Sequence, residues 1–444
     1  MGEKGIRDAR QLGTPKMLVL GVQHMFAMFG ATVLVPIITG LDVSVTLLFA
    51  GLGTLLFHFI TKLKVPAFLG SSFAFLGGYA AVRTHAAEMG VANWIPYAGL
   101  GVACAGLLYV VLSAFFKVYG AQRVMRFFPP IVTGPIIICI GITLANSAID
   151  NCQTNWWIAL LAIVTVIVCN IWGKGMIKII PILMGVLVSY GVAALIGQVD
   201  FTPLHEAPWL GFPIKGSQTV FSLFSGANTE LMTFALTSMI PIALATIIEH
   251  IGDMCAISST VGENFVSDPG LHRSLLGDGI ATSMAALFGA PANTTYGENT
   301  GVLALTQVYD PRVIRIAAGI AVIFAFSPKF AALISCMPTA AIGGVSLILY
   351  GMISAVGVRN VVENQVDFTK SRNVIIAALI MSLALGINFS KVGGIVFAVG
   401  SITIKLSGLA VAAIVGILLN ALLPGNDYEF GKNELGDTSV NFKV

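Results

Sequence analysis

Long apolar stretches separated by short charged links repeat along this chain from Lys16 to Pro424. Many of them reach about 17–25 residues, the length of helix that crosses the hydrocarbon core of a bilayer. Only 10% of the 444 residues are charged and 56% are hydrophobic, whereas soluble globular proteins carry about 25% charged residues. A single protein core cannot bury so much apolar surface, so we expect the excess to face lipid.

The stretches predict an all-α polytopic membrane protein with fourteen transmembrane segments. The predicted spans are 16–36, 42–61, 66–83, 96–116, 128–149, 155–172, 177–197, 232–256, 271–290, 291–307, 312–333, 338–357, 372–390 and 401–424. The first span is too long for the apolar region of a cleaved signal peptide and many spans follow it, so we expect it to be retained.

The lysines and arginines predict the orientation. If the N-terminus is cytoplasmic and the spans alternate, the outside links carry only four of the 24 basic residues, namely Arg83, Lys215, Lys329 and Lys391. Lys405 falls near the start of the last span, and the remaining nineteen lie on the inside. Because cytoplasmic loops are enriched in basic residues, we expect an even number of spans, both termini in the cytoplasm and a location in the cytoplasmic (inner) membrane.

Two sequence landmarks recur at nearly the same spacing. Gln23-His24 in the first span matches Glu249-His250 in the eighth, at an offset of 226 residues. Val65-Pro66-Ala67 at the third span matches Ala290-Pro291-Ala292 at the tenth, at an offset of 225. Each pair is seven spans apart, so the two halves cross the membrane in opposite senses. This pattern indicates a 7+7 inverted repeat, which is typical of secondary transporters.

Spans 3 and 10 are both interrupted by proline followed by small or polar residues. The interruptions read "VPAFLGSSFAF" and "APANTTYGENT". Non-helical backbone at membrane depth must be buried in protein or line a cavity. We expect a short extended strand and then a half-helix in each, with free N–H groups near Phe73 and Gly297 directed at a ligand. The alternative for either segment is a proline kink with a structural Ser/Thr cluster.

Ionisable residues inside membrane spans are costly and mark functional sites. The candidates are His24, Glu249, His250, Asp253, Asp278 and Glu298. Glu249 and Asp253 are four residues apart and share one helix face. When two carboxylates lie this close, one of them is expected to carry a proton. Such a protonated carboxyl group can couple transport to protons. His24 is expected to join this network, whereas Asp253 has the alternative of a hydrated cytoplasmic position. Asp278, between Gly277 and Gly279, is expected to serve a tight helix contact or an interfacial position.

The candidate site favours a neutral polar ring as ligand. Carboxylates accept hydrogen bonds and backbone amides donate them, which suits a planar heterocycle with N–H and C=O edges. Phe73 offers an apolar face, and Tyr296 is a possible second. Apart from Arg83 at the end of span 3, the broken spans contain no Lys or Arg, so an anionic ligand is poorly served. A nucleobase is the ligand class that this pattern indicates.

The remaining sequence features argue against several classes of function. The net charge of +3 implies no nucleic-acid partner. The six cysteines are scattered and have no metal-ligand spacing, so they are interpreted as apolar packing residues. The sequence lacks the His-Glu-x-x-His and Gly-x-Ser-x-Gly motifs that would indicate an enzyme. No cofactor is expected, and the proton is the expected coupling ion. A channel also contains broken helices, but an inverted repeat suits a carrier better.

The sequence resembles the nucleobase–ascorbate transporter family, and within it the bacterial uracil permeases. The resemblance runs from about Lys16 to Pro424 and is carried by "QHMFAMFGATVLVP", "KVPAFLGSSFAF", "EHIGD", "DPGLHRSLLGDG", "NTTYGENTGVLALTQVY" and "GGVSLILYG". The family signature reads Glu298-Asn299-Thr300-Gly301, then Thr306, with Gln307 in place of its usual last residue. Asp253 is a second departure, at a position where uracil permeases can carry His.

The resemblance implies import of uracil by proton symport with alternating access, and a homodimer. It implies substrate binding by Glu249, Glu298, Phe73 and Gly297, with Tyr296 nearby. Proton coupling would involve Glu249, His24 or Asp253. A glutamate at position 298 resembles uracil-type members, but a xanthine, other purine or broad nucleobase permease is the alternative.

The resemblance also implies a core domain and a gate domain. The predicted division is core 1–127 (spans 1–4), gate 128–197 (spans 5–7), extracytoplasmic loop 198–231, core 232–333 (spans 8–11), gate 334–424 (spans 12–14) and cytoplasmic tail 425–444.

Overall fold

The computed structural model describes residues 5–399, 402–426 and 428, and it is mostly helical. The helices are α1 (Thr14–Thr39), α2 (Val43–Ile60), α3 (Leu76–Glu88), α4 (Ile95–Tyr119), α5 (Ala121–Met125), α6 (Pro130–Gln153), α7 (Trp156–Trp172), α8 (Met176–Ile179), α9 (Pro181–Leu195), α10 (Thr202–Glu206), α11 (Thr229–Met239), α12 (Ile242–Val261), α13 (Leu271–Leu287), α14 (Gly297–Thr306), α15 (Pro311–Ala325), α16 (Pro328–Ser335), α17 (Thr339–Glu363), α18 (Ser371–Asn388) and α19 (Gly408–Leu422). The strands are β1 (Leu69–Ser71), β2 (Asn293–Thr295), β3 (Ile395–Val399) and β4 (Ile402–Leu406).

Several helices are long and apolar enough to cross a membrane. Among the described residues, seven segments meet this condition: α1, α2, α4, α6, α11 with α12, α17 and α18. An eighth results if α15 and α16 are taken as one bent span. The chain is therefore a multi-pass, mostly helical membrane protein.

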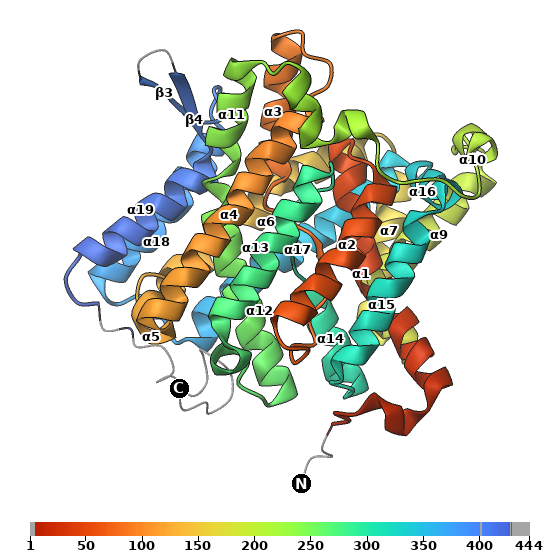
Figure 1. The fold of residues 1–444 in the computed structure, drawn as a ribbon, viewed down its shortest axis with the longest axis horizontal. Coiled ribbons are helices and arrows are strands. Elements are labelled where there is room, and N and C mark those ends of the chain that lie inside the picture. The colour runs from red at the N-terminus through yellow and green to blue at the C-terminus, as the bar shows by residue number, and fades with distance from the viewer. Residues whose placement is uncertain (1–4, 400–401, 427, 429–444) are drawn as a thin grey trace.

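The helices pack in two groups. One contains α1, α2, α4, α13 and α15, and the other contains α6, α7, α9, α17, α18 and α19 (Figure 1). Glycines allow close approach in both. A Cβ added to Gly106 of α4 would lie 2.6 Å from the carbonyl oxygen of Gly279 of α13, and one added to Gly141 of α6 would lie 2.2 Å from that of Tyr350 of α17. A methyl group at either position would therefore force these helices apart.

Strands β1 and β2, which lie more than 200 residues apart in sequence, pair at the centre of the first group. The pairing is antiparallel, with Leu69 opposite Thr295 and Ser71 opposite Asn293. Helix α3 follows β1 and helix α14 follows β2. Each proline-containing segment thus has a short strand before a helix, and the two strands satisfy each other's backbone groups.

Two predicted spans differ from the structure. The segment 312–333 is not one straight helix, because α15 and α16 are bent by 90°. The bend is fixed by Ser327, whose side chain accepts from the N–H of Phe330, and by Pro328 at the start of α16. The segment 401–424 is not helical throughout, since residues 402–406 form β4 and pair with β3. The β-branched Ile402, Thr403 and Ile404 favour this strand.

Candidate functional site

The β1–β2 pair lies at the centre of the candidate site and is buried. The N–H of Ser72 donates to the carbonyl of Ala292 (2.8 Å), and the N–H of Tyr296 donates to that of Phe68 (3.0 Å). All three residues of each strand are buried. Because the strands are antiparallel, α3 and α14 start near opposite ends of the pair and run away from it.

Phe73 follows β1 and contacts a residue that the sequence analysis did not select. Its ring packs edge-to-face against the ring of Tyr350 of α17, with centroids 5.8 Å apart. Only 7% of Phe73 is exposed. Tyr350 lies in "GGVSLILYG", a stretch that carries the family resemblance, but no spacing in the sequence indicates that it meets Phe73. This contact joins the two helix groups beside the strand pair.

Tyr296 follows β2, and its side chain crosses to β1. Its hydroxyl donates to the carbonyl of Ser71 (2.9 Å). A Cβ added to Gly70 would lie 2.4 Å from the Tyr296 ring, so the ring packs directly on the Gly70 backbone. The structure therefore places Tyr296 where it holds the two strands together.

Helix α12 carries the two predicted carboxylates, Glu249 and Asp253, and both are half-buried. The hydroxyl of Thr295 in β2 donates to Oδ2 of Asp253 (2.9 Å). Helix α12 contacts α14 and β2 in one group and α6 and α19 in the other. The carboxylates thus lie on a helix at the boundary between the groups, and Asp253 is bonded directly to the strand pair.

A buried pair formed by His250 and Asp278 lies next to these carboxylates. Nδ1 of His250 is 2.6 Å from Oδ2 of Asp278, and neither side chain is exposed. Nε2 of His250 is 3.0 Å from Oγ of Ser274, and Thr294 donates to Asp278 (3.5 Å). The expected tight helix contact of Asp278 is present through its glycine neighbours. The Asp278 carboxylate is fully buried against His250.

His24 is also fully buried, on α1, which contacts β1 and α14. Within the described part of the chain, neither ring nitrogen has a hydrogen-bond partner. The structure therefore does not bring His24 into the His250–Asp278 pair. Gly297 begins α14. The side chain of Glu298 lies outside the described residues, so its predicted role rests on the sequence.

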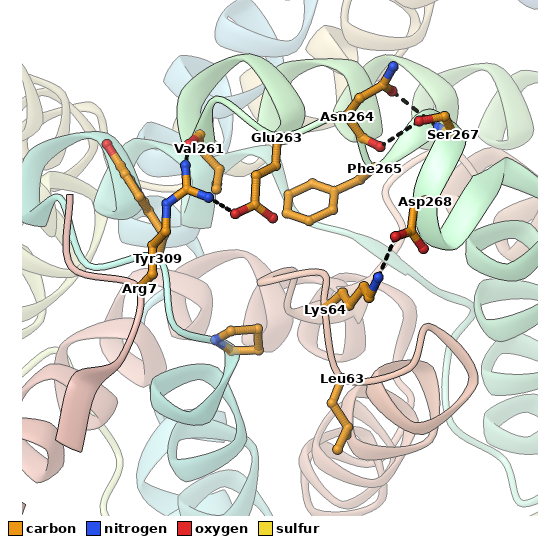
Figure 2. A pocket seen from close by; sticks show the side chains of 11 residues that line it. Arg7, Leu63, Lys64, Val261, Glu263, Asn264, Phe265, Ser267, Asp268 and Tyr309 are labelled. Carbon is orange, nitrogen blue, oxygen red and sulfur yellow. Dashed lines mark hydrogen bonds and ion pairs between the residues drawn. The ribbon is translucent and has the colours of Figure 1, made fainter. Parts of the chain in front are cut away.

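A separate cavity lies where loops and the N-terminal segment meet at one end of the first helix group. Its volume is about 480 Å³, and two ion pairs flank it, Arg7 with Glu263 and Lys64 with Asp268 (Figure 2). The Lys64 ammonium lowers the pKa of Asp268. No predicted site residue lines this cavity, which is therefore distinct from the candidate site.

Comparison with known proteins decides the family. The xanthine/uracil permease sequence model, described as "Permease family", matches residues 15–393. The chain belongs to the nucleobase–ascorbate transporter family. This permease is 42% identical to a uracil permease of Bacillus caldolyticus over 95% of its length and 94% of the relative. It is 37% identical to a uracil permease of Bacillus subtilis (strain 168), over 99% and 98% of the two chains.

The permease also resembles a solved structure, the transmembrane domain of the cyanobacterial bicarbonate transporter BicA. The TM-score is 0.59 at 16% identity, over 94% of this chain and 99% of that one. At this identity the likeness concerns the fold alone. Family membership places the permease among transporters.

Proposed function

We propose that this permease imports uracil across the cytoplasmic membrane by proton symport with alternating access. The curated relatives that match it over nearly their full length are named uracil permeases. The main structural support for the proposed site is the hydrogen bond from Thr295 to Asp253. This bond joins the strand pair to α12, the helix that contains the two carboxylates. No enzymatic step or cofactor is part of the proposal.

The proposed topology has fourteen spans in a 7+7 inverted repeat, with both termini in the cytoplasm. The seven or eight long apolar helices account for part of this number. Residues 66–88 and 291–306 would be the broken third and tenth spans. Spans 1–4 and 8–11 would form the core domain and spans 5–7 and 12–14 the gate domain. The two groups of contacting helices support this division. A homodimer through the gate domains completes this proposal.

Uracil would bind where the core and gate meet. Glu249 and Glu298 would accept hydrogen bonds from the ring N–H groups, and backbone N–H groups at Phe73 and Gly297 would donate to its carbonyl oxygens. Phe73 would also cover one face of the ring. Tyr296 would act mainly by holding β1 and β2, since its hydroxyl bonds to Ser71.

The coupling proton would reside on the carboxylates of α12. Glu249 is proposed as its main carrier, with Asp253 as its neighbour on the same helix face. His24 is buried and without a hydrogen-bond partner among the described residues, so its proposed part is to exchange a proton when the core and gate rearrange. Glu249 links the two functions, because one oxygen of its carboxyl group would accept from uracil while the other carries the proton.

A xanthine, other purine or broad nucleobase permease is the competing proposal. The sequence observation that favours uracil is Glu298 at the first position of the family signature. Purines are larger than pyrimidines, so competition by xanthine for uracil binding distinguishes the two proposals.

Replacement of Glu298 by Gln is expected to weaken uracil binding about tenfold, since one hydrogen-bond acceptor becomes a donor and about 1.4 kcal/mol is lost. Equilibrium binding of radiolabelled uracil to the purified protein measures this. Glu206→Gln in α10 is the matched control, because Glu206 is exposed and α10 lies at the edge of the molecule (Figure 1). Unchanged affinity in Glu298→Gln would remove Glu298 from the site.

A further inference from the structure

The edge of β1 that faces away from β2 is bonded to two side chains of α2. The N–H of Leu69 donates to Oγ1 of Thr54 (2.9 Å). Nε2 of His58 is 2.8 Å from the carbonyl oxygen of Ala67, and since a carbonyl only accepts, this nitrogen must carry the hydrogen. Both side chains are fully buried. Neither residue was selected from the sequence, and the proposed transport mechanism does not use them.

The alternation of an antiparallel pair explains why this edge needs partners. Phe68 and Ser72 bond to the opposite strand, so the backbone groups of Leu69 and Ser71 point away from it. The position is buried, and an unpaired backbone group there has no water to replace the missing bond. Thr54 supplies the acceptor for Leu69, and its own proton can go to the carbonyl of Ala50 (2.7 Å) or of Leu69 (3.2 Å).

The outer edge of β2 is held in a related way. The hydroxyl of Thr282 in α13 donates to the carbonyl of Asn293. Thr54 and Thr282 are 228 residues apart, close to the offsets of 226 and 225 between the repeated landmarks. His58 has no such counterpart, because the residue 228 positions later is Ala286. The threonine contact is thus part of the internal repeat, whereas the histidine contact belongs to the first half alone.

We propose that Thr54 and His58 are positioning residues for the substrate site. Together they fix the extended segment 67–71, and with it the backbone N–H groups and the ring of Phe73 that follow. This inference rests on the proposed binding of uracil at Phe73, but the position of the strand itself can be measured without substrate.

Two replacements of Thr54 separate the hydroxyl from the shape of the side chain. Thr54→Val keeps the shape and removes the acceptor, whereas Thr54→Ser keeps the acceptor. We expect faster amide hydrogen exchange in residues 66–75 and about tenfold weaker uracil binding in the valine variant. The maximal transport rate should change less than the KM, and the serine variant should match the wild type. Thr165→Val in α7 is the matched control, because the hydroxyl of Thr165 donates to the carbonyl of Leu161 in its own helix.

The histidine contact provides a second, independent pair of variants. Glutamine at position 58 can still donate to Ala67, whereas leucine cannot. We expect slow amide hydrogen exchange in residues 66–75 of His58→Gln and faster exchange in His58→Leu. If Thr54→Val does not fold, this pair of variants tests the positioning role by itself. Unchanged exchange and unchanged affinity in both Thr54→Val and His58→Leu would overturn the inference. If the wild type binds no uracil, the proposed substrate is contradicted, and the exchange comparison still tests Thr54 and His58.

Discussion

The Glu249→Gln variant should lose the uphill accumulation of uracil and still exchange uracil across the membrane. Glutamine resembles glutamate in shape but cannot take up a proton, so the variant lacks the proposed carrier of the coupling proton. A pH difference of two units supplies about 2.7 kcal/mol, enough for about 100-fold accumulation by a one-proton symporter. We expect this accumulation to fall to about onefold, measured as the inside-to-outside ratio of radiolabelled uracil in sealed vesicles.

The control for Glu249→Gln is the same substitution at the exposed Glu206. That variant should accumulate uracil like the wild type. Counterflow, in which labelled uracil enters vesicles preloaded with unlabelled uracil, reports whether Glu249→Gln still binds and moves substrate. Full accumulation by Glu249→Gln would refute its role in coupling.

The Asp278→Ala variant should lose about 3–5 kcal/mol of folding stability, because it leaves His250 unpaired at a fully buried position. Its transport should fall as well, since Asp278 and His250 both contact the threonines of β2. Thermal unfolding of the purified protein in detergent, followed by tryptophan fluorescence, measures the stability. Asp278→Asn keeps an acceptor for His250 and should be far less destabilised than the alanine variant.

Asp200→Ala is the control for the alanine substitution, because Asp200 is exposed just after α9. It should unfold at the wild-type temperature. If Asp278→Ala is as stable as Asp200→Ala, the buried pair does not stabilise the fold. If the asparagine and alanine variants are equally unstable, the negative charge itself is required, and a hydrogen-bond acceptor alone does not suffice.

Sequence reasoning located the strand pair because its signals are local. Pro66 and Pro291 interrupt apolar runs, and small polar residues follow each of them. Backbone that leaves a helix at membrane depth must find new partners, and the two segments lie at matching positions of the predicted repeat. The pairing of Leu69 with Thr295 was not predicted, because the register depends on which atoms meet in three dimensions.

The contacts around the strands could not be read from the sequence. Tyr350 meets Phe73, and Asp278 meets His250, only because helices distant in the chain pack side by side. Helical periodicity tells which residues share a face but not which helix that face contacts. For Asp278, the flanking glycines correctly indicated close packing, but they gave no sign of its buried partner His250. The strand β4 was missed because apolar β-branched residues suit a buried helix and a strand alike.

The measurement that tests the central proposal most directly is uracil uptake by the purified permease in sealed vesicles. Radiolabelled uracil is followed under an imposed inward proton gradient, with and without a protonophore, and with excess unlabelled xanthine. We predict gradient-driven accumulation that collapses with the protonophore and is insensitive to xanthine. Uptake that ignores the protonophore would contradict proton coupling, strong competition by xanthine would favour the purine alternative, and no uracil uptake under any gradient would contradict the proposed substrate.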